Sequence, residues 1–413
     1  MSRQFVVYHR EWRAQVAAAF PHLSKPQVTV LALFSLGMVF ARSCAVSAVA
    51  TFVAVALERP FDNVRQQLRE FCWEQAAKAG KHRQEVVVES CFVPLLRWIT
   101  SRWQGTQLAL ALDATTLGDR FGVLVVSVVY RGCAIPIAWT VLPAGQKHAW
   151  RREWLRMLRL LGPAVPATWT VLVLADRGLY ARWLFRRIVR LGWHPFLRIN
   201  RRGSFRPTND KRFWPVAAFA PEVATSWSGR GTAFATPECR LDCTLLARWE
   251  EGYEDPWLIL TDLLPEACEA CWYGLRMWIE RGFKLTKRGG WQWQATRMTD
   301  PERAERLWLV VAVATLWLVS VGGEADAEAP ESACEPVPTA LPTQKRQRHA
   351  TRLRQVGVFR GGLIRLVLTM LEHAPLPFGR FIPEPWPTAP PLPITQLYQE
   401  TASQNAGISN TYP

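Results

Sequence analysis

The sequence of 413 residues is poor in acidic side chains, with 34 Asp and Glu against 50 Lys and Arg. The net charge of +16 and the isoelectric point near 9.9 favour a polyanionic partner. Nucleic acid is preferred over an anionic membrane, because membrane binding would also require an insertion element. The sequence is not poor in apolar residues, and its 49% hydrophobic and 20% charged content excludes a chain that is disordered throughout.

Signals for secretion and for membrane insertion are missing. The start MSRQFVVYHREWRAQ is charged and has no apolar core followed by a cleavage site, so we expect a cytoplasmic protein with no membrane partner. The apolar stretches 28–57 and 307–321 contain polar residues or fall short of the roughly 20 residues of a membrane span. We expect both to be buried helices. The nine cysteines are scattered and odd in number, which fits reduced thiols better than a disulfide framework.

The length predicts two or three lobes, since one domain usually takes about 100–200 residues. Residues 1–100 have helical patterns and are expected to form a helical N-terminal DNA-binding domain, although helical packing without DNA contact is an alternative. Residues 101–200 give three strands and then alternate helix and strand, which predicts an α/β core with a mixed five-stranded sheet. Residues 201–264 combine short β segments with turn signals and are expected to be a β-rich insertion.

The remainder of the chain is expected to complete the core and then lose regular structure. Residues 265–322 contain two long helical patterns, at about 265–287 and 301–320. Residues 323–413 are expected to hold an acidic linker, a basic patch, a short helix and a Pro-rich tail that is extended or disordered. The basic run 345–354 has two open interpretations: it binds phosphates nonspecifically, or it keeps a linker solvated.

Two acidic residues follow apolar strands of the expected sheet. Asp113 ends the run LALALD and Asp176 ends the run VLVLAD. Ligand sites in open α/β sheets gather at the carboxyl ends of strands, so these carboxylates form one cation site if their strands are neighbours. The alternative is that each Asp caps the following turn, as Asp commonly does. Asp119 is a possible rival to Asp113, but it falls in an expected turn between strands.

The segment CWYGLRMWIERGFKLTKRGG supplies a third acid. A helical period of about 100° per residue places a hydroxyl, a carboxylate and three cations on one narrow face. These residues are Tyr273, Arg276, Glu280, Lys284 and Lys287. A solvated helix face with an ordinary Glu280–Lys284 pair would look similar. A solvated face would not explain why Glu280, the sole acid in a basic stripe, comes later in a sequence that already has two acids at strand ends.

The spacing Tyr273-x2-Arg276-x3-Glu280-x6-Lys287 resembles the Y-R-E-K signature of bacterial DDE transposases of the insertion-sequence-four type. The resemblance extends over about residues 108–320. It implies an RNase H-like catalytic core in which the first and fourth strands lie side by side and bring Asp113 and Asp176 together with Glu280. It also implies that Tyr273, Arg276 and Lys287, with Lys284 beside them, bind the DNA backbone around the cut.

The chemistry of such a triad follows from its charge. Three carboxylates in one cleft repel one another unless divalent cations neutralise them, and Mg²⁺ or Mn²⁺ suits oxygen ligands. Asp113, Asp176 and Glu280 are therefore both the expected catalytic residues and the expected ligands of two ions, which stabilise the attacking and leaving oxygens of a phosphoryl transfer. Water would free a 3′-hydroxyl at the element end, and that hydroxyl would attack target DNA.

These inferences predict a metal-dependent DNA transposase. Its partners would be the terminal inverted repeats of its own element and a target duplex, bound by a homodimer because two ends must be joined in one complex. One alternative is a stand-alone RNase H-like nuclease, which cleaves without strand transfer. Another is a domesticated, inactive transposase that acts as a DNA-binding protein, against which the intact acids argue.

Two weaker patterns remain open. Cys239-x3-Cys243 and Cys268-x2-Cys271 are a loose match to four zinc thiolates, with unmodified buried thiols as the alternative. Trp291 and Trp293 follow two glycines and are candidates for stacking on an unpaired base, with packing in the core as the alternative.

Overall fold

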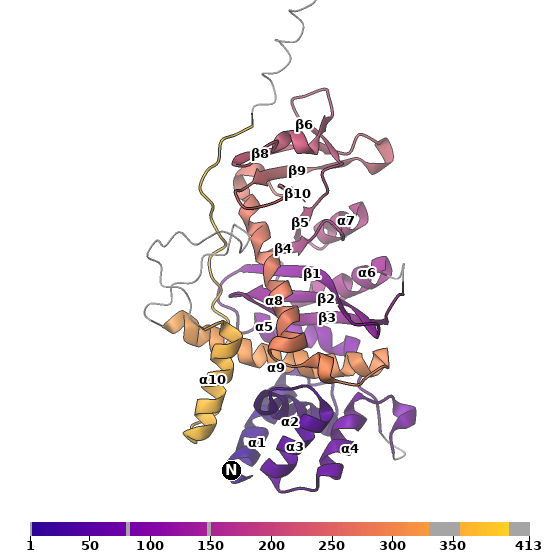
Figure 1. Ribbon diagram of the computed structural model, residues 1–413, viewed down its shortest axis with the longest axis vertical. Helices are drawn as coiled ribbons and strands as arrows, with labels where there is room; N and C mark the ends of the chain where they lie inside the picture. The colour runs from indigo at the N-terminus through magenta and orange to yellow at the C-terminus, as the bar shows by residue number, and fades with distance from the viewer. Residues whose placement is uncertain (1, 80–82, 147–149, 330–355, 396–413) are drawn as a thin grey trace, which may run out of the picture.

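The computed structural model describes residues 2–79, 83–146, 150–329 and 356–395. Figure 1 shows the N-terminal helices at one end of the elongated molecule, a long helix beside them, and a sheet that extends to the other end. The α-helices are α1 (Ser2–Ala19), α2 (Lys25–Ala41), α3 (Val46–Leu57), α4 (Phe61–Cys72), α5 (Phe92–Thr100), α6 (Trp150–Leu161), α7 (Arg182–Arg190), α8 (Met277–Lys284), α9 (Pro301–Glu328) and α10 (Val358–Leu371).

Within the described residues, one mixed sheet of ten strands runs in the order β3-β2-β1-β4-β5-β10-β9-β8-β6-β7. The strands are β1 (Gln107–Leu117), β2 (Phe121–Tyr130), β3 (Cys133–Pro143), β4 (Thr170–Ala175), β5 (His194–Arg198), β6 (Ser204–Pro207), β7 (Trp214–Pro215), β8 (Thr225–Ala233), β9 (Leu241–Trp249) and β10 (Trp257–Thr261). The fold is thus mixed α/β, with three consecutive antiparallel strands followed by alternating helices and strands, as the sequence predicts.

The expected five-stranded sheet is wrong in its extent. Strand β10, which ends the segment expected as a separate β-rich insertion, pairs antiparallel with β5. An edge strand carries a row of unpaired N–H and C=O groups, and β10 satisfies those of β5. The strands of the insertion therefore continue the sheet, a pairing between distant segments that local sequence patterns do not reveal.

The relation between β1 and β4 positions the first two acids. The two strands pair in parallel, from Gln107 opposite Thr170 to Leu112 opposite Ala175. Asp113 therefore lies level with the end of β4 and Asp176 directly follows it. The sequence predicts that strand β1 ends at Asp113. This end is wrong, because pairing with β2 continues to Leu117 opposite Phe121.

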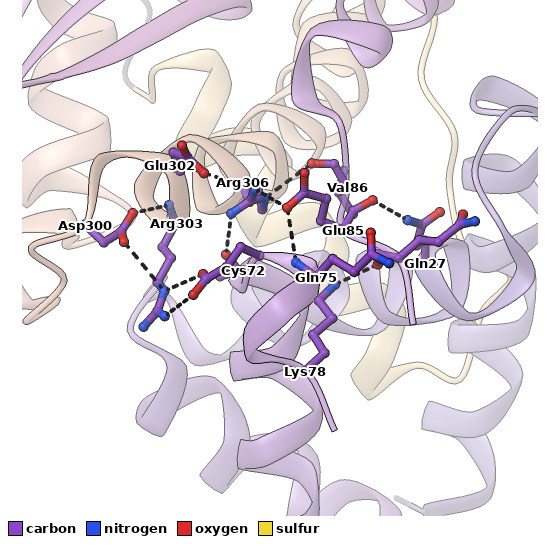
Figure 2. A network of polar contacts seen from close by, with 12 residues as sticks. Gln27, Cys72, Gln75, Lys78, Glu85, Val86, Asp300, Glu302, Arg303 and Arg306 are labelled. Carbon is purple, nitrogen blue, oxygen red and sulfur yellow. Dashed lines mark hydrogen bonds and ion pairs between the residues drawn. The ribbon is translucent and has the colours of Figure 1, made fainter. Parts of the chain in front are cut away.

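Helix α9 joins the sheet to the N-terminal helices, since it contacts β3 on one side and α2 and α4 on the other. It begins at an Asp300 N-cap, whose side chain accepts from the backbone N–H of Arg303. Figure 2 shows Arg303 and Arg306 of α9 reaching the segment after α4. Arg306 is buried and donates to the backbone oxygens of Cys72 and Val86 and to the Glu85 carboxylate.

The apolar helices serve as core elements. By length and hydropathy α9 is able to cross a membrane, and α2 with α3 passes the same test as a pair bent by 95°. However, 94% of the apolar window of α9 is buried inside the protein. Because neighbouring helices and β3 cover it, the hydrophobicity of α9 is accounted for by the fold.

Helix α9 is eight residues longer than expected, since it continues from Ser320 to Glu328 through the start of the predicted acidic linker. Distant arginines pair with these acids: Arg131 contacts Asp326 at 2.6 Å, and Arg380 contacts Glu324 and Glu328. Ion pairs with other segments therefore stabilise a stretch whose local composition is typical of a linker. The rest of that linker and the basic run 345–354 lie outside the described residues.

The Pro-rich segment after α10 is extended, one of the two forms expected. It runs from α10 along the molecule toward the far end of the sheet (Figure 1). Phe381 is fully buried and pairs through its backbone with Arg102 and Gln104. Near the end of the described segment, Ile394 bridges to Ser226 of β8. The tail thus spans the sheet that the core and the insertion share.

Candidate active site

Asp113 projects from β1 into a site between the sheet and α8. Its neighbours two and four residues earlier, Ala111 and Ala109, pack in one cluster with Trp278 and Ile279 of α8. Side chains alternate along a strand, so Asp113 faces the same side. Its Oδ1 accepts from the N–H of Ala114 at 2.8 Å. Burial raises the pKa of this carboxyl, and this effect outweighs the lowering by nearby Arg276.

Asp176 caps the turn after β4, as one alternative expected, and it also contacts Arg276. Its Oδ1 accepts from the N–H groups of Gly178 and Leu179, at 2.9 and 3.2 Å, and so caps the turn after β4. Its Oδ2 lies 3.4 Å from a guanidinium nitrogen of Arg276. Because the cap uses only one oxygen, the other faces the site, and the turn fixes its direction.

The guanidinium of Arg276 connects all three acids. Its Nη2 donates to Asp113 Oδ2 at 2.9 Å and lies 3.4 Å from Asp176 Oδ2, while its Nη1 donates to Glu280 Oε1 at 3.0 Å. Burial acts to lower the pKa of Arg276, but Tyr273 and the acids outweigh it, so the pKa is raised. Glu280 pairs with the arginine one turn before it. The Glu280–Lys284 pair of the alternative interpretation, a solvated helix face, does not occur among the described contacts.

The expected single α-helix over 265–287 is wrong. A 3₁₀ segment runs over Ala270–Arg276, α8 covers Met277–Lys284, and a π turn follows over Leu285–Gly289. The 100° spacing therefore does not apply to Tyr273, which is 5% exposed and packs edge-on against Trp257, away from a solvated face. Burial raises its pKa to about 12, and the acids Asp113 and Asp176 also act on it. The hydroxyl thus lies within the electrostatic field of the site.

The two lysines lie at the end of α8 and beyond it. Lys284 is the last residue of α8 and is exposed, and Lys287 is half-buried in the π turn. Burial lowers the pKa of Lys287, and the neighbouring charge of Arg288 lowers it further. Neither lysine has an ion pair with a described residue, so both amines are available to an anionic partner. Neither lysine takes part in the ion pairs that join Arg276 to the three acids.

Gly282 is a positioning residue that the sequence interpretation missed. An added Cβ at this position would lie 2.9 Å from the Cβ of Ala134 in β3. Helix α8 can therefore approach the sheet closely at this point, one half-turn after Glu280, only because residue 282 has no side chain. A glycine inside a helical pattern was the available signal.

The donor chemistry of the three acids fits a hard divalent cation. The carboxylates carry three formal charges and the guanidinium supplies one in return, so the cluster favours further positive charge. The guanidinium of Arg276 shows that one cation can contact all three acids at once. The described part of the chain contains no group of three His, Cys, Asp or Glu side chains already spaced as a metal site. An ion shared by the acids therefore requires Arg276 to move aside.

For the two weaker sequence patterns, the structure favours packing in the core over a binding role. Trp291 and Trp293 are buried in the core, where Trp291 Nε1 donates to Thr315 and Trp293 stacks on Phe121, so base stacking by these rings is wrong. Burial raises the pKa of the Cys268 thiol to about 12, and this thiol donates to the Leu264 oxygen. Cys239 is exposed whereas the other three thiols of the zinc pattern are buried.

Asp119 is exposed in the turn between β1 and β2, as expected, and does not belong to the Arg276 cluster.

A search of curated proteins gave no match to the chain. Residues 106–317, slightly more than half of the 413, match the family described as Transposase DDE domain. The matched range contains all three acids that converge on Arg276. The chain therefore belongs to the transposase DDE domain family and is a DNA transposase.

Proposed function

We propose that this DNA transposase serves a bacterial insertion sequence of the insertion-sequence-four type, cutting the element ends and joining them to target DNA. The observation that carries the proposal is the convergence of Asp113, Asp176 and Glu280 on one guanidinium. These acids come from β1, from the turn after β4 and from α8. Acids so far apart in sequence gather at a strand edge where α/β folds bind ligands.

The strand arrangement supports an RNase H-like core. Strands β3, β2 and β1 form an antiparallel unit, and β4 and β5 continue it in parallel with β1. Helices α6 and α7 pack on this part of the sheet, and α8 crosses its other face. The helical segment formed by α1–α5 precedes the core, and we propose that it grips the element end.

The carboxylates of Asp113, Asp176 and Glu280 are the proposed ligands of Mg²⁺ or Mn²⁺, as two ions. When bound, such ions supply Lewis-acid stabilisation of the oxygens that gain charge at the transferred phosphate. The turn N–H groups that fix Asp176 and the Ala114 N–H that fixes Asp113 hold these ligands in place before DNA binds. Carboxylates that are already fixed in this way need no reorganisation during the reaction.

The cations of the signature segment are the proposed backbone clamp. Arg276 neutralises the acids in the arrangement described here, and with DNA present its fork of donors suits a phosphate oxygen. Lys284 and Lys287 extend the positive charge along the same segment. Tyr273 is buried, so only its hydroxyl is positioned to contribute, and its aromatic ring supports the 3₁₀ segment against Trp257.

A strand-transfer assay tests the proposal, with paired element-end duplexes, a plasmid target and Mg²⁺. The full chain should yield joined product as a dimer on two ends. Asp113→Asn, Asp176→Asn and Glu280→Gln should each abolish cleavage while end binding is kept, because each change removes a ligand and little volume. Near-normal cleavage by any one of them would refute that assignment. Cleavage without joining would favour the stand-alone nuclease, and end binding without cleavage by the wild type would favour the domesticated protein.

A further inference from the structure

A groove of about 970 Å³ lies between α6 and α7. Eight of its ten lining residues are arginines, four from each helix, and none is acidic. We call this surface the arginine groove; its most exposed members are Arg151, Arg152, Arg159, Arg186 and Arg190. Such a concentration of one charge costs free energy through self-repulsion, so it indicates a surface built for a partner of opposite charge.

Little within the protein compensates this charge. Of the eight arginines, only Arg156 forms ion pairs with described residues, namely Glu89 and Glu153. Arg151 lies over the ring of Trp183 at 5.7 Å, a contact that links the two helices and leaves the positive charge in place. The Nε of Arg187 is buried and has no hydrogen-bond partner among the described residues. A buried donor of this kind is costly unless a ligand accepts from it.

The groove and the catalytic acids lie on opposite faces of the sheet. Leu108, Leu110 and Leu112 of β1 belong to the core that also contains the apolar sides of α6 and α7, whereas Ala109 and Ala111 pack toward α8. Asp113 continues the second set by strand alternation. Figure 1 shows α6 and α7 next to each other at one side of the sheet and α8 crossing in front of it. The arginine groove is therefore a surface separate from the proposed backbone clamp.

We propose that the arginine groove binds the sugar–phosphate backbone of duplex DNA outside the stretch that is cut. Arginine presents a planar fork of donors that matches phosphate oxygens, which explains the use of arginine throughout the groove where lysine would supply the same charge. Trp183 is half-buried under Arg151 and leaves little ring surface for stacking on unpaired bases. Recognition is thus through phosphates and independent of base sequence. The proposal requires DNA as the partner and does not require the catalytic assignment of the three acids.

Salt-dependent binding of the full chain to a duplex without element-end sequence, in the absence of divalent ions, tests this site. The variant Arg186→Gln/Arg190→Gln removes two exposed cations of α7, and Arg360→Gln/Arg365→Gln removes two exposed cations of α10 as the matched control. The slope of log Kobs against log salt should become shallower by about two for the groove variant. Its affinity near 0.1 M salt should fall on the order of tenfold or more. The control should keep the wild-type slope.

Two further measurements separate the outcomes. Arg186→Lys/Arg190→Lys should keep the slope, because the charge is retained, while affinity falls modestly through loss of the planar fork. Thermal unfolding of each variant should match that of the wild type, because the replaced side chains are exposed. Equal slopes for the groove and control variants would overturn the proposal. So would a groove variant that loses affinity for an RNA hairpin of equal length but keeps its affinity for duplex DNA. Since no cleavage is measured, failure of the catalytic assignment would leave this result unaffected.

Discussion

Arg276 donates a 2.9 Å hydrogen bond to Asp113 across 163 residues of sequence. The contact fixes the α8 segment against β1 and places the third acid, Glu280, on the other guanidinium nitrogen. One cation thus holds the acids together in a cluster where mutual repulsion would separate them. Under the proposed metal assignment, a divalent ion would enter the position that this guanidinium occupies, so neutralisation by Arg276 and by a metal would be alternatives.

Replacement of Arg276 should make stability dependent on divalent ions. In Arg276→Gln the three carboxylates lose their shared cation, and we expect the free energy of unfolding to fall by about 2–4 kcal/mol in buffer without divalent ions. Addition of Mn²⁺ should restore most of this loss and raise the melting temperature more than in the wild type. Differential scanning fluorimetry with and without Mn²⁺ measures both effects. Arg276→Gln/Asp113→Asn is the control, and its recovery should be much weaker because one ligand is absent.

Replacement of Lys287 tests the backbone clamp. Lys287→Ala should weaken binding to element-end DNA and lower the salt slope by about one phosphate contact. Arg360→Ala, on the exposed surface of α10, is the matched control and should leave the slope unchanged. Binding titrations at four or five salt concentrations give the slopes. An unchanged slope in Lys287→Ala would remove this residue from the clamp.

Glu305 of α9 should give the protein a stability that falls as pH rises. Burial raises the pKa of this carboxyl from 4.5 to about 7, although it accepts from the N–H of Val141 at 3.0 Å. Between these values the folded state binds more protons than the unfolded state, so stability is present at low pH and is lost through this window. Glu305→Gln can still accept this bond and does not titrate. Above pH 7.5 it should be more stable than the wild type by roughly 1–3 kcal/mol, with little difference near pH 4.

Chemical denaturation at several pH values measures the Glu305 effect. The difference between variant and wild type should grow with pH. A difference that stays constant from pH 4 to pH 8 would show that Glu305 titrates normally in the folded protein.

The extended C-terminal segment should contribute measurably to the core. Phe381 is fully buried between Trp103 and Tyr130, with ring centroids 5.9 and 5.3 Å away. Phe381→Ala should lower the free energy of unfolding by about 3–5 kcal/mol through lost burial and a cavity. Ile394→Ala is the control within the same segment, because its side chain is 74% exposed and its loss should be nearly neutral. Equal small effects of the two changes in urea unfolding would show that the segment does not anchor to the core.

The sequence by itself determined the elements that rest on local patterns. The apolar runs of β1 to β3, the helical period of α4 and α7 and the Asp after β4 can all be read from neighbouring residues in the chain. The spacing of Tyr273, Arg276, Glu280 and Lys287 can be read from the sequence without knowledge of the fold, and its assignment as a signature remains a prediction. These features predicted a DDE transposase, and the matched range shows that family; the finer insertion-sequence-four assignment remains a proposal.

Only the tertiary structure decided which distant groups meet. Register between β1 and β4 placed Asp113 level with Asp176, and close packing at Gly282 brought α8 against the sheet. The pairing of β10 with β5 joined the insertion to the core sheet, and arginines 131 and 380 extended α9 through its acidic end. In each case the stabilising partner lies far away in the chain, and local propensity carries no information about it. The 100° helical period placed Tyr273 wrongly for the same reason. Tyr273 lies in a 3₁₀ segment and packs against Trp257, a residue outside that segment.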